Sequence, residues 1–207
     1  VFAVSRSSEQ ETVFAPYRWY QEVPKNFQFQ ILDINSGLDR IKNILNHFQP
    51  HYIINFAAQS MVAQSWEFPN HWINTNVLAI TNLINILKDY DRLEKFIQVT
   101  TPEVYGSTTK KIKEDAVMHP STPYAVSRAA GDMMLKLYQE QLGLPVNFTR
   151  AANVYGPGQQ LYRIIPRTIL SALSGKKMYL HGGGSSIRSF IHIHDVVEAT
   201  LTIAEKA

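Results

Sequence analysis

The sequence predicts a doubly wound α/β fold, in which helices cover both faces of a parallel β-sheet. Short β-rich runs alternate along the chain with longer segments of helical hydrophobic spacing. Residues 50–57 (Pro-His-Tyr-Ile-Ile-Asn-Phe-Ala) form an almost wholly apolar run, and such runs are typical of strands buried on both faces. Ligands bind such sheets at the carboxyl ends of the strands. The segments that follow the strands are therefore where functional side chains are expected.

The hydrophobic patterns predict the elements in order. Residues 1–5 are strand-like, and residues 27–34 begin with strict polar–apolar alternation before a turn at Asn35-Ser36-Gly37. Two helices carry clear apolar stripes at helical spacing. The stripe of the first helix, 38–48, consists of Leu38, Ile41, Ile44 and Leu45, and that of the second, 72–90, of Val77, Ile80, Leu83, Ile84 and Leu87. Further strands are predicted at 50–57, 95–101 and 145–151, and further helices at 124–142, 164–174 and 196–206.

Composition excludes several classes of protein. Of the 207 residues, 45% are hydrophobic and 18% charged, which is the profile of an ordinary folded chain. The net charge is only +3 and the basic residues are scattered, so we expect no nucleic-acid partner. No apolar run approaches the roughly 18 residues of a membrane span, so no membrane partner is expected. The chain has no cysteine, which excludes disulfides and thiolate chemistry and is compatible with the cytoplasmic location that we predict.

Three predicted strand or helix ends are chemically distinctive. Residues 55–60 (Asn-Phe-Ala-Ala-Gln-Ser) are small enough for a ligand to approach the backbone, although small residues also serve in strand–helix packing. Residues 100–106 (Thr-Thr-Pro-Glu-Val-Tyr-Gly) place a carboxylate directly after a buried strand. Such a glutamate can act as a general base, and the alternative is a solvated loop residue that caps a backbone group.

The third distinctive segment starts a helix at residues 121–128 (Ser-Thr-Pro-Tyr-Ala-Val-Ser-Arg). Thr122 fits the N-cap and Pro123 the first helical position. Tyr124 and Arg128 are then one turn apart on the same face. A cation beside a phenol lowers the phenol pKa from about 10 toward neutrality, which suits a proton acceptor. The alternative is a surface tyrosine that packs on an arginine stem.

These segments, in this order and spacing, resemble the extended short-chain dehydrogenase/reductase family, and within it the nucleotide-sugar 4,6-dehydratase and epimerase group that includes dTDP-glucose and GDP-mannose 4,6-dehydratases. Residues 100–106 resemble the family's Ser-Thr-Asp-Glu-Val-Tyr-Gly, and residues 123–128 its Pro-Tyr-x-x-x-Lys. Residues 152–157 (Ala-Asn-Val-Tyr-Gly-Pro) and 188–191 (Arg-Ser-Phe-Ile) resemble its substrate-diphosphate segments. The resemblance implies a Rossmann-like fold, a homodimer formed through helices 72–90 and 124–142, and a nucleotide-diphosphate sugar as substrate.

The resemblance also implies a role for each matching residue. Tyr124 takes the proton of the sugar 4-hydroxyl, Thr101 hydrogen-bonds the same oxygen, and Glu103 removes the C5 proton before water leaves from C6. The catalytic set is therefore Thr101, Glu103, Tyr124 and Arg128. The cofactor-binding set comprises Arg6, Ser7, Asp33, Ile34, Ala57, Ala58, Gln59, Tyr124 and Arg128. The substrate-binding set comprises Ser60, Thr101, Asn153, Arg163 and Arg188.

Two positions depart from the family pattern and keep alternatives open. Pro102 stands where dTDP-glucose dehydratases have an acidic Asp, so Glu103 would have to act as both base and acid. Arg128 stands where the family has Lys, and its planar guanidinium is not geometrically equivalent. The alternatives are a nucleotide-sugar 4-epimerase, which usually lacks the Glu, and a catalytically impaired member that only binds nucleotide sugars.

The cofactor prediction rests on the end of the first strand. NAD-dependent members usually have Asp there for the ribose 2′-hydroxyl, whereas this chain has Ser5-Arg6-Ser7-Ser8. Arg and Ser suit a 2′-phosphate, so NADP is predicted, with NAD as the alternative. His192 and His194 alternate along a predicted strand and could resemble metal ligands, but they fall in a structural strand of the family, so no metal is predicted.

The first glycine in the sequence is Gly37. The family's glycine-rich loop, which seats the cofactor pyrophosphate at a helix N-terminus, is therefore expected upstream of Val1. On this expectation residues 1–155 are an incomplete dinucleotide-binding domain that lacks its first strand. Residues 156–207 would be a mixed region of final Rossmann elements and the start of a smaller substrate lobe, so the chain would be truncated at both ends.

Overall fold

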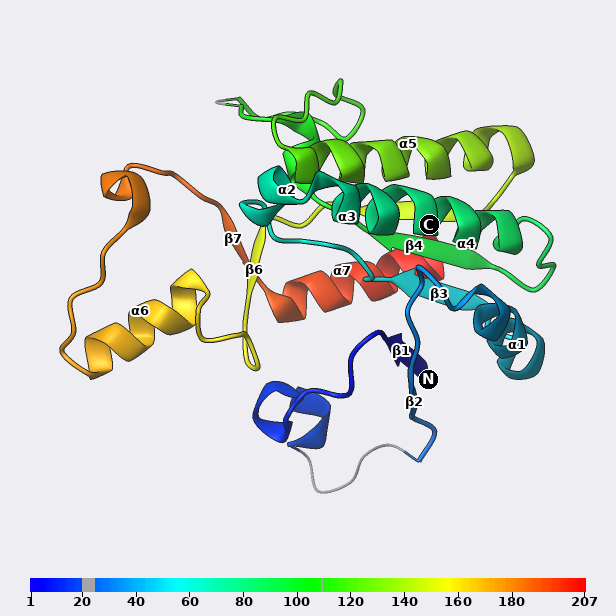
Figure 1. Cartoon of the computed structure of the whole chain (residues 1–207), viewed down its shortest axis with the longest axis horizontal. Helices are drawn as coiled ribbons and strands as arrows, with labels where there is room; N and C mark the ends of the chain where they lie inside the picture. Colours follow the sequence, from blue (N-terminus) through cyan, green and yellow to red (C-terminus); the bar gives the residue numbers. More distant parts are fainter. Residues whose placement is uncertain (20–24, 109) are drawn as a thin grey trace.

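A computed structural model describes residues 1–19, 25–108 and 110–207 of the chain (Figure 1). Its centre is a parallel sheet in the order β3 (Tyr52–Asn55), β4 (Lys95–Val99) and β5 (Val146–Thr149). The middle strand is the most deeply buried, since Phe96, Ile97 and Gln98 are each at most 1% exposed. An apolar strand between two parallel neighbours confirms the α/β class that the sequence predicts.

The predicted single sheet is wrong in one respect, because the strands form three separate parallel ladders. Strand β1 (Phe2–Ser5) pairs with β2 (Gln28–Ile31), and β6 (Asn153–Tyr155) pairs with β7 (Phe190–His192). Among the described residues neither pair is hydrogen-bonded to the central three strands. Strand β2 is also shorter than predicted. The Asp33 carboxylate accepts the backbone and side-chain N–H groups of Asn35 at 2.9 and 2.7 Å, which turns the chain away from the ladder.

Two long helical segments cover one side of the central sheet (Figure 1). The predicted helix 72–90 is a composite of α3 (Pro69–Ile73), a π-helical segment η3 (Asn74–Leu78) and α4 (Ala79–Leu87), preceded by the short α2 (Gln64–Glu67). Helix α5 (Pro123–Leu142) starts at the predicted cap, where the Thr122 hydroxyl accepts the Ala125 N–H at 3.1 Å. It ends at Gly143, whose φ of 69° is left-handed.

Helix α5 packs closely against the π-helical segment. A Cβ added at Gly131 would lie 2.4 Å from the Asn76 carbonyl oxygen, so only glycine fits this contact. The buried residues of α1 (Leu38–Phe48) and α4 form one hydrophobic core with β4 and β5. The two predicted apolar stripes are confirmed. Their buried members are Ile41, Leu45, Ile80, Leu83, Ile84 and Leu87.

The remaining helices are α6 (Ile164–Leu173), which has no buried residue, and α7 (Ile193–Lys206). Helix α7 lies on the side of β4 opposite to α5 (Figure 1). Short 3-10 turns occur at Thr12–Phe14 (η1), Pro16–Arg18 (η2), Pro102–Tyr105 (η4) and His181–Gly184 (η5). Within the described part of the chain no helix is both long and apolar enough to cross a membrane.

The two histidines do not share a strand face, which corrects the geometry assumed from the sequence. Helix α7 starts at Ile193, three residues before the predicted start, so His194 is helical while His192 ends β7. The His192 Nδ1 atom accepts the His194 backbone N–H at 3.2 Å and caps the helix. Its ring packs edge-on against Tyr155, with 5.3 Å between ring centres. These contacts give His192 a structural role.

Candidate active site

The turn after β4 is fixed at both ends. Thr101, 7% exposed, accepts the Glu103 backbone N–H through its hydroxyl oxygen at 3.2 Å, which caps the short turn η4. At the other end Gly106 adopts a φ of 72°, and a Cβ there would lie 2.3 Å from the His119 carbonyl oxygen. The turn therefore holds half-buried Glu103 at the carboxyl end of the central strand, which is the location that the fold class predicts.

Tyr124 lies in the first turn of α5 and faces the same strand end. Its backbone N–H donates to the buried Ser65 hydroxyl at 3.1 Å, which ties α5 to α2. Its phenol is affected by a hydrogen bond with the Thr101 side chain and by the charges of Arg128 and Glu103. The structure therefore brings together the four predicted catalytic residues.

The electrostatics of Tyr124 correct one expectation. Burial raises the pKa of the Tyr124 phenol, and this effect outweighs Thr101 and Arg128, both of which lower that pKa. Glu103 and Asp132 raise the pKa of the phenol further. Arg128 therefore acts in the predicted direction, but its charge alone does not bring the phenol toward neutrality.

Arg128 is turned into the protein rather than toward open solvent. It is 3% exposed, and its guanidinium donates to the Val99 carbonyl oxygen at the end of β4. Its Nε has no hydrogen-bond partner among the residues that the structure describes, and burial lowers the pKa of the guanidinium. The side chain thus links helix α5 to the central strand, and its contact with a cofactor ribose stays a prediction.

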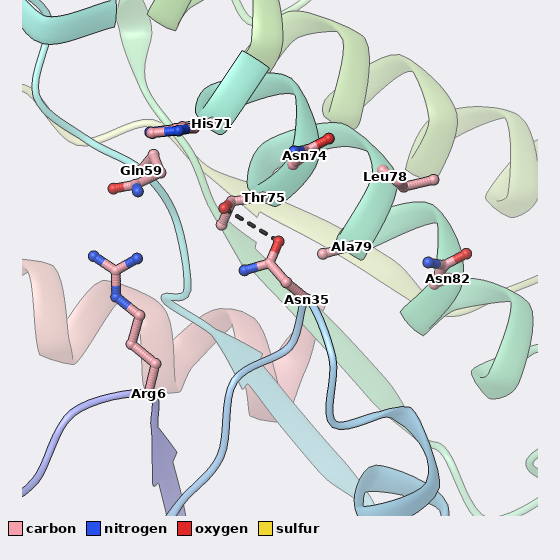
Figure 2. A pocket seen from close by; sticks show the side chains of 9 residues that line it. All are labelled: Arg6, Asn35, Gln59, His71, Asn74, Thr75, Leu78, Ala79 and Asn82. Atoms are coloured by element: carbon pink, nitrogen blue, oxygen red, sulfur yellow. Dashed lines mark hydrogen bonds between the residues drawn. The ribbon is translucent and has the colours of Figure 1, made fainter. Parts of the chain in front are cut away.

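A cavity of about 440 Å³ lies between the segments that follow β1, β2 and β3 and the helical segment α3–η3–α4 (Figure 2), and none of the four predicted catalytic residues lines it. Arg6, after β1, and Gln59, after β3, line one side of it, and both are predicted cofactor-binding residues. The guanidinium of Arg6 points toward Gln59 in Figure 2. The other lining residues are Asn35, His71, Asn74, Thr75, Leu78, Ala79 and Asn82. Most of the lining side chains are polar, and Arg6 places a cation on one side of the cavity.

The loop after β3 is held in place by buried amides. The Asn55 carboxamide oxygen accepts the Ala57 N–H at 3.1 Å, and its NH₂ donates to Gln98 at 2.8 Å. The Asn76 side chain accepts the Gln59 N–H at 2.9 Å and donates to the Gln59 carbonyl at 3.0 Å. The Asn76 NH₂ also donates to the Ser127 hydroxyl of α5 at 2.9 Å. The predicted cofactor loop is thus connected directly to the catalytic helix.

The other predicted nucleotide contacts differ in their surroundings. The Asp33 carboxylate is engaged by Asn35, which itself lines the cavity, and Ile34 packs on the hydrophobic core. Ala58 is half-buried, whereas Ser60 is exposed. The exposed Ser7 donates its N–H to the Ser5 hydroxyl at 3.3 Å. Of this set only Arg6 and Gln59 line the cavity, and the roles of all of them stay predictions.

Three of the predicted substrate-binding residues, Asn153, Arg163 and Arg188, lie outside the central layers. Asn153, on β6, donates its NH₂ to the Ser189 carbonyl at 2.8 Å, so it is adjacent to the Arg188 segment. The Arg188 Nε donates to the Ser186 hydroxyl at 3.0 Å. Arg163 precedes α6 and stacks its guanidinium 5.3 Å from the Tyr162 ring centre. All three side chains are exposed, and their role in substrate binding stays a prediction.

Sequence reasoning missed several residues at the site. Asn74, Thr75 and Asn76 interrupt the apolar stripe of the predicted helix, and this polar interruption was the available signal. Ser65 gave no signal, because its partner Tyr124 is 59 residues away. Asp132 and Arg150 form an ion pair of 3.0 Å beneath the site, and Asp132 lies one helical turn after Arg128. Burial raises the pKa of the Asp132 carboxyl, while Arg150 and Arg128 lower it.

A Tyr-x-x-x-Arg turn beside a Thr-x-Glu turn, at the carboxyl edge of a parallel sheet, is the arrangement of the extended short-chain dehydrogenase/reductase class, with Arg128 in place of the usual Lys. The sequence pattern of the family described as GDP-mannose 4,6 dehydratase matches residues 1–207. The chain therefore belongs to that family, as its motifs predicted.

Individual relatives agree with this assignment. The dTDP-D-glucose 4,6-dehydratase of Homo sapiens is 39% identical over 155 residues, covering 74% of this chain and 44% of the relative. The structure of a Bacillus anthracis dTDP-glucose 4,6-dehydratase in complex with NAD superposes with a TM-score of 0.82 at 27% identity, over 99% of this chain and 71% of that one. The structure of a Thermotoga maritima UDP-glucose 4-epimerase with UDP-glucose superposes with a TM-score of 0.85 at 26% identity, over 100% of this chain and 65% of that one. The chain spans from 28% to 59% of the length of such curated relatives.

Proposed function

We propose that the complete gene product is a nucleotide-sugar 4,6-dehydratase that converts a nucleotide-diphosphate hexose into its 4-keto-6-deoxy derivative. The observation that supports this most directly is the convergence of Thr101, Glu103 and Tyr124 at the end of β4. A ketone-forming proton acceptor and a carboxylate base are the two groups that dehydration requires. A 4-epimerization needs only the first of them.

The residues divide the reaction between them. Tyr124, once its phenol has lost its own proton, takes the proton of the sugar 4-hydroxyl, and the Thr101 hydroxyl hydrogen-bonds the same oxygen. A bound nicotinamide dinucleotide supplies the hydride chemistry, by accepting hydride from C4 and returning it at C6. Glu103 takes the C5 proton that the 4-ketone has made acidic, and then delivers it to the C6 hydroxyl, which leaves as water. When hydride returns at C6, C5 takes up one proton from solvent, and the proton that Tyr124 removed from the 4-hydroxyl is released to balance it. Pro102 has no proton to donate, so Glu103 performs both transfers.

A panel of dTDP-, GDP-, CDP- and UDP-hexoses, analysed by mass spectrometry, tests this proposal. A product lighter by one water supports dehydration, and an isomer of unchanged mass supports the 4-epimerase alternative. Tight binding without any product supports an impaired member of the family, for which Pro102 and Arg128 are the motivating departures. If the protein binds a nucleotide sugar but forms no product because Arg128 replaces the usual Lys, Arg128→Lys should restore product formation.

Glu103→Gln tests the assignment of the base. We expect this variant to oxidise C4 but to form no dehydrated product, because the amide accepts no proton. Glu114→Gln is the matched control, since Glu114 is an exposed carboxylate on the following loop. Normal dehydration by Glu103→Gln would show that another group removes the C5 proton.

We further propose NADP as the preferred cofactor, with NAD as the alternative. Arg6 supports this preference, because its guanidinium lines the cavity and suits a 2′-phosphate. Arg6→Gln should weaken NADP binding more than NAD binding when both are measured by calorimetry. Arg40→Gln, an exposed change on α1, should leave both affinities unchanged. Equal losses for the two cofactors would contradict the preference.

A homodimer through α4 and α5 and a cytoplasmic location complete the proposal. Several apolar side chains on these helices and on the preceding turns are exposed, including Leu78 at 54%, Met133 at 63% and Leu137 at 50%. Met133→Lys should convert the protein to a monomer in analytical ultracentrifugation, whereas Leu173→Lys on α6 should not. A tagged gene product followed by microscopy or fractionation checks the location.

A further inference from the structure

Arg150 joins three separate elements immediately behind the candidate active site. It follows β5, and its Nη2 donates to the Asp132 carboxylate of α5 at 3.0 Å. Its Nη1 donates to the Tyr105 hydroxyl of the η4 turn, also at 3.0 Å. The guanidinium carbon lies 5.3 Å from the ring centres of both Tyr105 and Phe148, so two aromatic rings contact the cation. The planar guanidinium can satisfy both acceptors in this arrangement.

This cluster is buried and charged. The Asp132 side chain is 1% exposed and that of Arg150 is 15% exposed. Arg128, at 3% exposure, acts electrostatically on the same carboxylate. Within the described part of the chain, three atoms of these residues have no hydrogen-bond partner: Arg128 Nε, Asp132 Oδ1 and Arg150 Nε. Well-packed apolar residues often stabilise a core at least as well as a buried ion pair, so the cluster is not explained by stability alone.

Tyr105 connects the cluster to the turn that carries Glu103. Its hydroxyl accepts from Arg150 and donates to the Glu114 carbonyl oxygen at 2.7 Å. Tyr105 is two residues after Glu103 in the same short 3-10 turn, and the Gly106 N–H donates to the Glu103 carbonyl at 3.0 Å. A displacement of Tyr105 would therefore be transmitted to Glu103 through one turn of backbone.

We propose that Asp132, Arg150 and Tyr105 form a positioning device that fixes the Glu103 turn relative to the Tyr124 helix. Asp132 is two helical turns after Tyr124 on α5, and Arg150 bridges from it to the turn of Glu103. The spacing between the phenol and the carboxylate is thus set by side chains that do not contact substrate. The role of the device in catalysis rests on the proposed function, because it matters there that Glu103 reaches both C5 and the C6 oxygen.

Tyr105→Phe is the most direct test, since it removes only the hydroxyl and retains the ring beside the cation. In the full-length protein we expect the amides of residues 102–106 to exchange with deuterium about tenfold faster, as measured by mass spectrometry. We also expect kcat for the dehydrated product to fall about 10- to 100-fold, as for a small misplacement of a catalytic group. KM should change less than about twofold, because the diphosphate contacts are elsewhere.

Tyr90→Phe is the matched control, since the Tyr90 hydroxyl also donates to a backbone carbonyl, that of Pro50, at 3.2 Å. This variant should change neither the exchange of residues 102–106 nor kcat. Arg150→Lys keeps the charge but cannot bridge both acceptors, so it should resemble Tyr105→Phe. Unchanged exchange in Tyr105→Phe overturns the proposal, as does a loss of thermal stability with normal kcat. The exchange comparison needs no substrate, so it decides the positioning role even if the wild-type protein forms no dehydrated product.

Discussion

Predicted functional residues occur in two contrasting surroundings, the start of α5 and the segment 153–192. Seven residues of α5 are buried, whereas α6 has none. Arg128, in the first region, is 3% exposed and bonded to a strand carbonyl. Arg163 and Arg188, in the second, are exposed, and the contacts of their guanidinium groups are with close neighbours in sequence, Tyr162 and Ser186.

Under the proposed function, the difference in burial corresponds to two different tasks, proton transfer in the first region and substrate binding in the second. Proton transfer needs groups fixed within a fraction of an ångström, which packing and a second layer of hydrogen bonds provide. Holding a diphosphate needs exposed cations that a ligand can reach and order. On this interpretation the first region is preorganised and the second acquires its final arrangement from the substrate, in keeping with its low burial.

The largest expected effect is on catalysis in the first region. Tyr124→Phe should lower turnover of the nucleotide sugar by about 10²- to 10⁴-fold, the usual contribution of a general base. Product formation by mass spectrometry is the measurement. Tyr138→Phe, farther along the same helix, should retain wild-type turnover. If both variants behaved alike, the start of α5 would not be the catalytic region.

The next effect is on folding stability. Arg150→Ala leaves the Asp132 carboxylate buried without its partner, and such a change costs about 3–5 kcal/mol. Arg163→Ala removes an exposed guanidinium and should change stability by less than about 0.5 kcal/mol. Urea unfolding of the two variants, followed by tryptophan fluorescence, compares the regions directly. Equal losses of stability in the two variants would show that the two regions do not differ in how far their arginines stabilise the fold.

The sequence was most informative where the determining signals are local. Helix α5 starts at the predicted threonine cap and proline, because N-cap chemistry involves only four consecutive residues. The apolar stripe of α1 was likewise found, since its periodicity lies within eleven residues. The two predicted catalytic segments, residues 100–106 and 121–128, could be located for a similar reason, because each is a short segment at the end of a strand or the start of a helix.

Features set by distant partners could not be predicted in this way. The π-helical turn at Asn74–Leu78 places Asn76 between Gln59 and Ser127, residues 17 positions before it and 51 after it. The division of the strands into three ladders depends on pairing across the fold. The pKa of Tyr124 depends on burial of the phenol, which spacing to Arg128 does not reveal.

A smaller effect concerns the close approach of α5 to the π-helical turn. In a helix interior alanine is normally preferred to glycine by about 0.5–1 kcal/mol. At position 131 we expect the opposite preference: Gly131→Ala should destabilise the protein by about 1–3 kcal/mol, because the added carbon would lie 2.4 Å from the Asn76 carbonyl oxygen. On the exposed helix α6 the usual preference for alanine should hold, so Ala172→Gly should lower the stability of the protein by about 1 kcal/mol. Thermal unfolding of both variants is the measurement, and a stabilised Gly131→Ala would show that the helices can separate without cost.

The smallest effect is a shift in ionisation at the catalytic helix. Burial raises the pKa of the Tyr124 phenol above its ordinary value of 10.0, so the protonated form predominates at neutral pH. Its contribution to stability is present below the ordinary pKa and is lost as pH rises through the raised pKa. Ultraviolet titration of the wild type minus Tyr124→Phe should therefore show a midpoint above 10.0. Arg128→Gln should raise that midpoint further, because a cation that lowers the pKa is removed, whereas Arg128→Lys keeps the charge and should raise it less. A midpoint at or below the ordinary value would show that the phenol is already activated without a cofactor, and that preorganisation of the first region includes its electrostatics as well as its geometry.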